Sequence, residues 1–449
     1  MAAIVAVIAI LFLQLALARN PVLAAGIRDA EIEHTIRVYA SPLLRAAGFE
    51  PEDVSLHILN DKGINAFVAQ GQRIFLTSGL LMAAQRPEQV VGVLAHEIGH
   101  ITGGHLARLS GTLKDARNHA LIGQVIGLAL GVLSKNNSVT AATNAKSSEI
   151  AVKGVLRFSR TQERSADQVA INLLEKTRTS ATGLLEFFEL LQGQELLVRA
   201  RQDAYVVTHP RTEDRIAFVR EHIEKSRYSG NHLPGRVRAM HERMTAKLKG
   251  FINPPAQTLQ EYPADDPAIN ARYARAMAYY RDSRMEEALK LIGGLLKQLP
   301  NDPYFHELRG QILFENGKLT EALPDYERAV ALRPQQPLLR VGLAHVQVEL
   351  NKPPLIKAAI HNLEEALRYD RFLPLLWQLA ATAYGRNGQL GRSALALSEH
   401  HLLLGRYQDA QGQAAKAMRI LAKDSPSWLR AQDIENTAKS IRDRKGKRN

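Results

Sequence analysis

The order of apolar and polar residues predicts a helix and then short strands in the first part of the chain. In residues 28–48 apolar side chains recur every three or four positions up to Gly48, which is typical of an amphipathic helix. Residues 54–60 alternate between apolar and polar, and residues 64–79 show two more short strand patterns that meet around Gly71. We therefore expect a small antiparallel β-sheet.

Helical periodicity dominates the residues that follow. Residues 80–109 predict helices, the second of which has Pro87 near its first turn. Residues 150–177 predict a long amphipathic helix, and further helical patterns continue to about Gly250. The expected fold class is therefore mainly α with a small antiparallel β-sheet.

Two apolar segments raise the question of membrane contact. Residues 2–18 are apolar except for Gln14, and small residues follow, so we interpret residues 1–25 as an export signal, with an uncleaved anchor as the alternative. Residues 119–134 are apolar on nearly every side but short for a membrane span. A buried core helix is the first interpretation of this second segment, and a flap that touches a membrane or covers a site is the other.

The second half of the chain shows an internal repeat. Ala288 and Ala322 are 34 residues apart, as are Pro300 and Pro334, and each pair lies in similar sequence. This period is typical of tetratricopeptide repeats, which stack helical hairpins into a solenoid with a concave surface. More degenerate copies occur further along. We expect an organisation with these ranges: residues 1–25 signal peptide, 26–250 first domain, 251–268 proline-rich linker, 269–424 repeats and 425–449 basic tail.

The charge balance is strongly basic, with 58 Lys and Arg against 45 Asp and Glu and a net charge of +13. This excess favours contact with an anionic membrane face. Nucleic acid is not expected as a partner, because no basic and aromatic binding module accompanies the charge. The chain has no cysteine, so disulfides and thiolate metal sites are excluded. We expect the basic end of the chain to be disordered.

The stretch LAHEIGHITGGHL, residues 94–106, contains the candidate chemistry. His96, Glu97 and His100 fit the HExxH pattern, in which two histidines one helical turn apart bind one metal ion and the glutamate acts as base. Apolar residues precede the motif, so the helix is expected to be buried, where imidazoles and a carboxylate need partners. A zinc ion would bind these groups and so offset the cost of burying them.

The third metal ligand is less certain from spacing alone. His105 lies five residues after His100, which rotates it away from the ligand face of an ideal helix, so we favour another role for it. Glu163 in SRTQERSADQVA is the better candidate, with Asp167 one turn later positioned to accept the free N–H of a ligand histidine. A plain surface carboxylate remains the competing interpretation of Glu163.

Four stretches in this order resemble a known family: NAFVAQGQRIFLTSGLL, LAHEIGHITGGH, SRTQERSADQVA and THPRTEDRI, followed by the repeats. The chain resembles the BepA-like periplasmic zinc metalloproteases and chaperones of the HtpX-like gluzincin family. The resemblance implies a gluzincin-type domain with His96, His100 and Glu163 as zinc ligands and Glu97 as base. It also implies that His209 can take the fourth coordination position and hold the enzyme latent.

The resemblance extends to residues around the metal. It implies that Asp167 supports a ligand histidine and that Arg215 faces the site. It further implies that Asn65, Ala66 and Phe67 lie on a hairpin edge that holds the substrate as an added strand. Family members that carry a disulfide differ from this cysteine-free chain.

Two functions from different classes follow. The first is a zinc endopeptidase of the periplasm that cleaves misfolded or stalled outer-membrane proteins and assists their assembly, with the repeats recruiting clients or assembly machinery. The second is a repeat-based chaperone or adaptor with a structural or vestigial metal site. Glu97 favours the enzyme, because a structural site needs no base at that position. Intramembrane proteolysis would need several membrane-spanning helices, and the sequence offers one at most.

Overall fold

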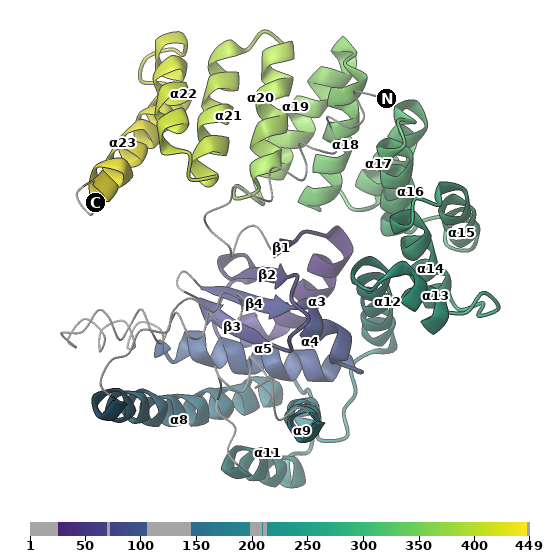
Figure 1. Ribbon diagram of the computed structural model, residues 1–449, viewed down its shortest axis with the longest axis vertical. Coiled ribbons are helices and arrows are strands. Elements are labelled where there is room, and N and C mark those ends of the chain that lie inside the picture. The colour runs from purple at the N-terminus through teal and green to yellow at the C-terminus, as the bar shows by residue number, and fades with distance from the viewer. Residues whose placement is uncertain (1–25, 70–71, 106–144, 198–208, 210–212, 447–449) are drawn as a thin grey trace. The chain divides into compact units, whose positions relative to one another are not determined.

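The computed structural model describes residues 26–69, 72–105, 145–197, 209 and 213–446 (Figure 1). The chain divides into two compact units at Ile252 and Asn253, and each is described separately. Within the described residues, no helix is both long enough and apolar enough to cross a membrane. The expected signal, residues 1–25, and the apolar segment 119–134 lie outside the described residues.

A four-stranded sheet opens the first unit, in the order β1-β2-β4-β3. Its strands are β1 (Gly26–Ile27), β2 (Ser55–Leu59), β3 (Ala66–Ala69) and β4 (Arg73–Thr77). β3 and β4 form the expected antiparallel hairpin, and β1 pairs antiparallel with β2. β2 and β4, however, run parallel.

The expectation of a purely antiparallel sheet is therefore wrong, and the sheet is mixed. After β2 the chain crosses to the far edge of the sheet, forms β3 there, and returns as β4 between β3 and β2. Two reversals of direction make β4 parallel to β2. Alternation of apolar residues predicts each strand but does not say which strand is its neighbour.

The first unit also contains seven described helices (Figure 1). They are α3 (Ala30–Ala46), α4 (Ser78–Ala83), α5 (Pro87–Thr102), α8 (Ala145–Lys176), α9 (Thr182–Leu197), α11 (Glu213–Lys225) and α12 (Gly235–Ile252). Of these helices, α3, α4 and α5 contact the sheet. The side chain of Asp29 accepts hydrogen bonds from two backbone N–H groups at the start of α3, which stabilises that helix end. The long helix expected over residues 150–177 is confirmed as α8.

Two glycines in α5 let α8 and α9 approach this helix closely. A Cβ atom on Gly99 would lie 2.6 Å from the carbonyl oxygen of Ala166 in α8. A Cβ atom on Gly92 would lie 2.7 Å from the backbone nitrogen of Leu184 in α9. Any larger residue would push these helices apart. The close approach of α8 at Gly99 matters for function, because this glycine lies between Glu97 and His100.

The second unit consists of stacked helical hairpins that confirm the repeat fold (Figure 1). Ala288 and Ala322, the residues that set the period, are both fully buried. After α13 (Pro255–Glu261), the pairs are α14 (Ile269–Arg281) with α15 (Met285–Gln298), α16 (Pro303–Glu315) with α17 (Leu319–Leu332), α18 (Pro337–Leu350) with α19 (Pro353–Leu367), α20 (Pro374–Arg386) with α21 (Leu390–Leu403), and α22 (Tyr407–Ile420) with α23 (Pro426–Gly446).

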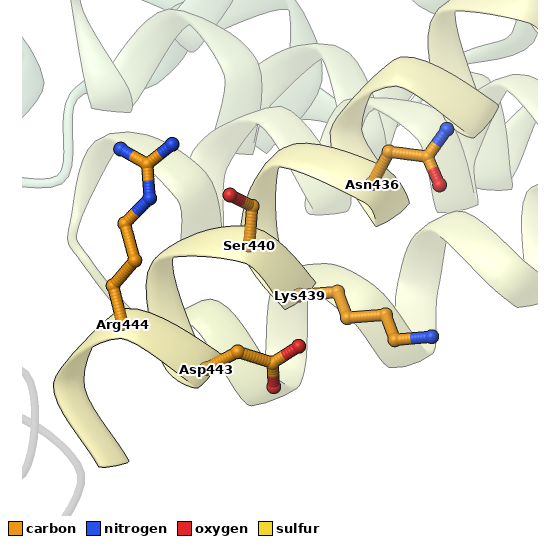
Figure 2. Close-up of a pocket in the computed structure, with 5 residues that line it drawn as sticks. All are labelled: Asn436, Lys439, Ser440, Asp443 and Arg444. Carbon is orange, nitrogen blue, oxygen red and sulfur yellow. The ribbon is translucent and has the colours of Figure 1, made fainter. Parts of the chain in front are cut away.

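The basic end of the chain is helical as far as Gly446, so the expectation of disorder is wrong for the described part of it. Ala431, Ile434 and Ala438 of α23 are fully buried and pack with residues of α21 and α22. Burial of these apolar residues stabilises a helix whose composition alone suggests a solvated tail. The opposite face of α23 carries a shallow polar hollow (Figure 2), lined by Asn436, Lys439, Ser440, Asp443 and Arg444.

Candidate metal centre

Helix α5 places the HExxH residues in the interior of the first unit. Pro87 occupies its first turn, where the missing N–H is not needed for the helix. Val90, Val93 and Leu94 are fully buried in the core. His96 and Glu97 are fully buried and His100 is nearly so, which confirms the expected burial of this segment.

Helix α8 brings a carboxylate to the two imidazoles. Nε2 of His96 lies 3.0 Å from Nε2 of His100, so the same ring atom of each histidine points to a shared space. Glu163 contacts both, with one carboxylate oxygen 3.2 Å from Nε2 of His96 and the other 3.3 Å from Nε2 of His100. The competing interpretation of Glu163 as a surface carboxylate is wrong, since only 3% of it is exposed.

His209 completes the cluster as a fourth buried residue. Its Nδ1 lies 3.2 Å from both carboxylate oxygens of Glu163 and 3.3 Å from Nε2 of His96. Its Nε2 lies 3.5 Å from Oε1 of Glu97. Possible ligand atoms of His96, His100, Glu163 and His209 all lie within 4.8 Å of one another.

Asp167 and Arg215 support the cluster from behind. Oδ1 of Asp167 lies 2.9 Å from Nδ1 of His96, on the side of the ring away from the shared space. Arg215 donates from Nε and Nη2 to the two oxygens of Asp167, at 2.6 and 2.8 Å, and its Nη1 lies 3.1 Å from Glu163. Its guanidinium also lies over the ring of Phe188, 4.8 Å from the centroid. Phe188 was not expected from the sequence.

His105 lies outside the four-residue group but contacts one of its members. Its Nδ1 is 3.0 Å from Nδ1 of His100. The rotation expected for a continuous helix does not apply, because α5 ends at Thr102 and Gly104 adopts a positive φ of 59°. The two glycines before His105 are the sequence signal that the helix ends there.

Burial and mutual contacts shift the pKa values of the residues in the cluster. Burial lowers the pKa of His96, but hydrogen bonds with Asp167 and Glu163 outweigh it and raise this pKa to about 9. Burial lowers the pKa of His100. Burial acts to raise the pKa of Glu163, yet the charge of His209 and hydrogen bonds from the histidines hold it well below its usual value. Burial likewise opposes ionisation of Asp167, but Arg215 and His96 lower its pKa.

This donor set fits a divalent metal ion. Imidazole nitrogens and a carboxylate are the ligands that zinc takes in catalytic sites. A divalent cation can replace the protons in the hydrogen bonds between these histidines and Glu163, because it binds the same nitrogen and oxygen lone pairs. Glu97 adds a second indication, because both of its carboxylate oxygens are buried without a hydrogen-bond partner. Burying a carboxylate without a hydrogen bond costs free energy, so its presence here indicates a functional role.

The hairpin edge lies next to the helix that carries the motif. β3 is the edge strand of the sheet and contacts α5. Asn65, just before β3, accepts a backbone hydrogen bond from Thr77 at 3.0 Å. Ala66 is fully buried against the core, whereas Phe67 is partly exposed. Among the described residues, no strand pairs with the outer edge of β3.

Comparison with known proteins gives two family matches. The model of peptidase family M48 matches residues 27–223, and a tetratricopeptide repeat model matches residues 273–337. The first range contains His96, Glu97, His100, Glu163 and His209.

Individual relatives extend the similarity over most of the chain. The beta-barrel assembly-enhancing protease of Yersinia pestis is 23% identical, over 87% of this chain and 80% of its own length. The protein of the same name from Escherichia coli strain K12 is 25% identical, over 79% of this chain and 72% of its own length. Metalloprotease YcaL of Escherichia coli strain K12 is 27% identical over 38% of this chain. The chain is a metallopeptidase with an M48 domain followed by tetratricopeptide repeats, and it is homologous to the beta-barrel assembly-enhancing proteases.

Proposed function

We propose that the chain is a zinc-dependent endopeptidase of the periplasm that cleaves misfolded or stalled outer-membrane proteins and assists their assembly. The observation that carries the proposal is the buried cluster of His96, His100 and Glu163 with Glu97 beside it. Homology to beta-barrel assembly-enhancing proteases supports the substrate class and the compartment. In this proposal the repeats recruit clients or assembly machinery, and the net charge of +13 favours peripheral contact with an anionic membrane.

The chain's own residues divide the chemistry between them. His96, His100 and Glu163 would hold one zinc ion, which when bound polarises a peptide carbonyl and makes water a better nucleophile. Glu97 accepts the proton of the attacking water and passes it to the leaving amine. Asp167 fixes the tautomer of His96 by accepting its Nδ1–H, so that Nε2 faces the ion. Asn65, Ala66 and Phe67 align the substrate along the edge of β3.

A second candidate function is favoured by His209. Structural zinc sites are closed by four protein ligands, and His209 supplies a fourth beside His96, His100 and Glu163. A repeat-based chaperone or adaptor with a structural ion would also have four protein ligands around that ion. The two functions differ in what they require of Glu97. A structural site gains nothing from a buried carboxylate that accepts no hydrogen bond and lies 3.5 Å from the fourth ligand.

The decisive experiment compares wild type with Glu97→Gln on casein and on an unfolded outer-membrane β-barrel protein. The endopeptidase proposal predicts that the variant keeps its zinc and its fold and loses cleavage by about 100-fold or more. Glu189→Gln is the matched control, because this carboxylate on α9 is half-exposed and pairs with Arg220 on α11. Equal cleavage by wild type and Glu97→Gln would favour the structural site. Cleavage of casein alone would leave an endopeptidase with a different substrate class.

A further inference from the structure

Three aromatic rings form a ladder across the sheet of the first unit. His57 in β2 pairs with Phe75 in β4, and Phe75 pairs with Phe67 in β3. The rings of His57 and Phe75 are 4.7 Å apart and nearly parallel, at 18°. Those of Phe75 and Phe67 are 5.0 Å apart, at 10°. The ladder therefore runs across three adjacent strands and ends at the edge strand.

The ladder lies on the face of the sheet away from α5. Of the neighbours of Phe67 in β3, Ala66 belongs to the hydrophobic core that contains Leu94 and Ile98 of α5, and Val68 packs against that core. Successive side chains of a strand point to opposite faces. Phe67 therefore points away from the helix that carries the metal-binding histidines.

Phe67 is the open end of the ladder. Within the described residues β3 pairs with β4 alone, so its other edge offers unpaired backbone groups. Phe75 is almost fully buried between its two ring neighbours, whereas Phe67 is partly exposed. In a strand added along β3, the residue opposite Phe67 would point to the same face, with its side chain at the next place in the ladder.

We propose that Phe67 determines substrate specificity by selecting an aromatic side chain on the substrate residue that pairs with it. The inference rests on the proposed function, in which substrates add as a strand to β3. Stacked rings of cross-strand neighbours attract beyond the burial of their area. The substrate residues on either side of the selected one face α5, so recognition by Phe67 is separated from the reacting bond. Aromatic residues recur in the strands of outer-membrane β-barrels, which fits such a preference.

The first test is a set of peptides that differ at one position at a time, cleaved by the zinc-loaded full chain. We expect one position at which Phe, Tyr or Trp raises kcat/KM over Ala by roughly twofold to tenfold. Phe67→Ala should abolish this preference at that position only. Phe67→Tyr should keep it, and Phe67→Leu should replace it with a preference for aliphatic residues. No positional preference in wild type, or a preference unchanged in Phe67→Ala, would overturn the inference.

A matched control uses the other end of the ladder. His57→Ala removes a ring that stacks on Phe75 but lies two strands from the edge, so it should leave the preference in place. Equal loss in His57→Ala and Phe67→Ala would show that the ladder acts only through folding, which contradicts the inference.

A binding measurement separates this inference from the proposed function. Zinc-loaded Glu97→Gln should bind a fluorescent peptide with the aromatic residue more tightly than its alanine counterpart, by a factor similar to the kinetic one. An aromatic preference in binding without any cleavage by wild type would overturn the endopeptidase and leave the role of Phe67 intact. Cleavage by wild type without an aromatic preference would support the endopeptidase and overturn the role of Phe67. Equal binding of the two peptides would also overturn the role of Phe67.

Discussion

Oδ1 of Asp167 lies 2.9 Å from Nδ1 of His96, while Nε2 of the same ring faces His100, Glu163 and His209. The imidazole of His96 is thus held from behind and directed at the metal cluster. Both residues are fully buried, so the contact is shielded from bulk solvent. Arg215 in turn holds Asp167 through two hydrogen bonds.

This relationship predicts that Asp167→Asn weakens zinc binding. An amide is a poorer acceptor than a carboxylate and cannot offset the positive charge of Arg215, so we expect affinity for zinc to fall about 10- to 100-fold. Competition with a zinc chelator measures the change. Asp214→Asn serves as control, because its carboxylate pairs with Arg164 at the surface. Equal affinities in the two variants would contradict a supporting role for Asp167.

His105 is expected to position His100 in a similar way. If Nε2 of His100 binds zinc, its Nδ1 must carry the hydrogen of the neutral ring, and Nδ1 of His105 at 3.0 Å is placed to accept it. His105→Ala should therefore lower zinc affinity, again by about 10- to 100-fold. His105→Gln offers a carbonyl acceptor and should restore part of the loss. If Ala and Gln behave alike, the histidine serves only to fill space.

His209→Ala tests latency. If His209 occupies the fourth coordination position, its removal opens that position to water, and proteolysis should rise several-fold. The rate of casein cleavage by zinc-loaded protein is the measurement. His222→Ala on α11 provides a matched control, since this partly buried histidine pairs with Glu175 away from the cluster. Unchanged or lower activity in His209→Ala would assign this residue a packing role.

His241 in α12 predicts a pH dependence of stability that is separate from the metal. It contacts the backbone oxygen of Ala84 at 2.8 Å and the hydroxyl of Tyr39 at 3.2 Å. Burial lowers its pKa, and the hydrogen bond to Ala84 and the charges of Glu88 and Glu242 only partly oppose this. As the pH falls, His241 is therefore protonated in the unfolded chain before it is protonated in the folded one. The free energy of unfolding decreases as the pH falls below 6.5, the pKa of an ordinary histidine.

Thermal unfolding between about pH 8 and pH 5.5 tests this, because it spans the titration of an unfolded histidine. The melting temperature of wild type should fall on acidification, and that of His241→Gln should fall less. His232→Gln, at an exposed position, is the control and should keep the wild-type slope. Parallel pH profiles for wild type and His241→Gln would show that His241 does not contribute.

The motifs predicted much of the site because the ligands lie at fixed helical spacings. His96 and His100 share a helix face by period alone, and Glu163 and Asp167 do so on the second helix. That the two pairs come together depends on tertiary packing, in which Gly99 lets α8 approach α5 closely. The family resemblance, and not spacing, pointed to His209 and Arg215, since both lie more than 40 residues along the chain from the nearest metal-binding residue of the motifs, Glu163.

The misses have physical causes of the same kind. Alternation predicts a strand but not its neighbour, so the parallel pairing of β2 and β4 was not foreseen. The contact of His105 with His100 depends on a helix end and a positive φ at Gly104. Ala431 and Ile434 stabilise α23 through packing on α22, which local composition does not reveal.

The central claim is that His96, His100 and Glu163 hold one zinc ion beside Glu97. Metal content per chain, measured after dialysis of wild type and Glu163→Gln against the same zinc buffer, tests it most directly. We predict one zinc per chain in wild type and a clear deficit in Glu163→Gln, with the fold of both checked by circular dichroism. A wild-type chain that holds no zinc, or a folded Glu163→Gln chain that retains it fully, would contradict the account.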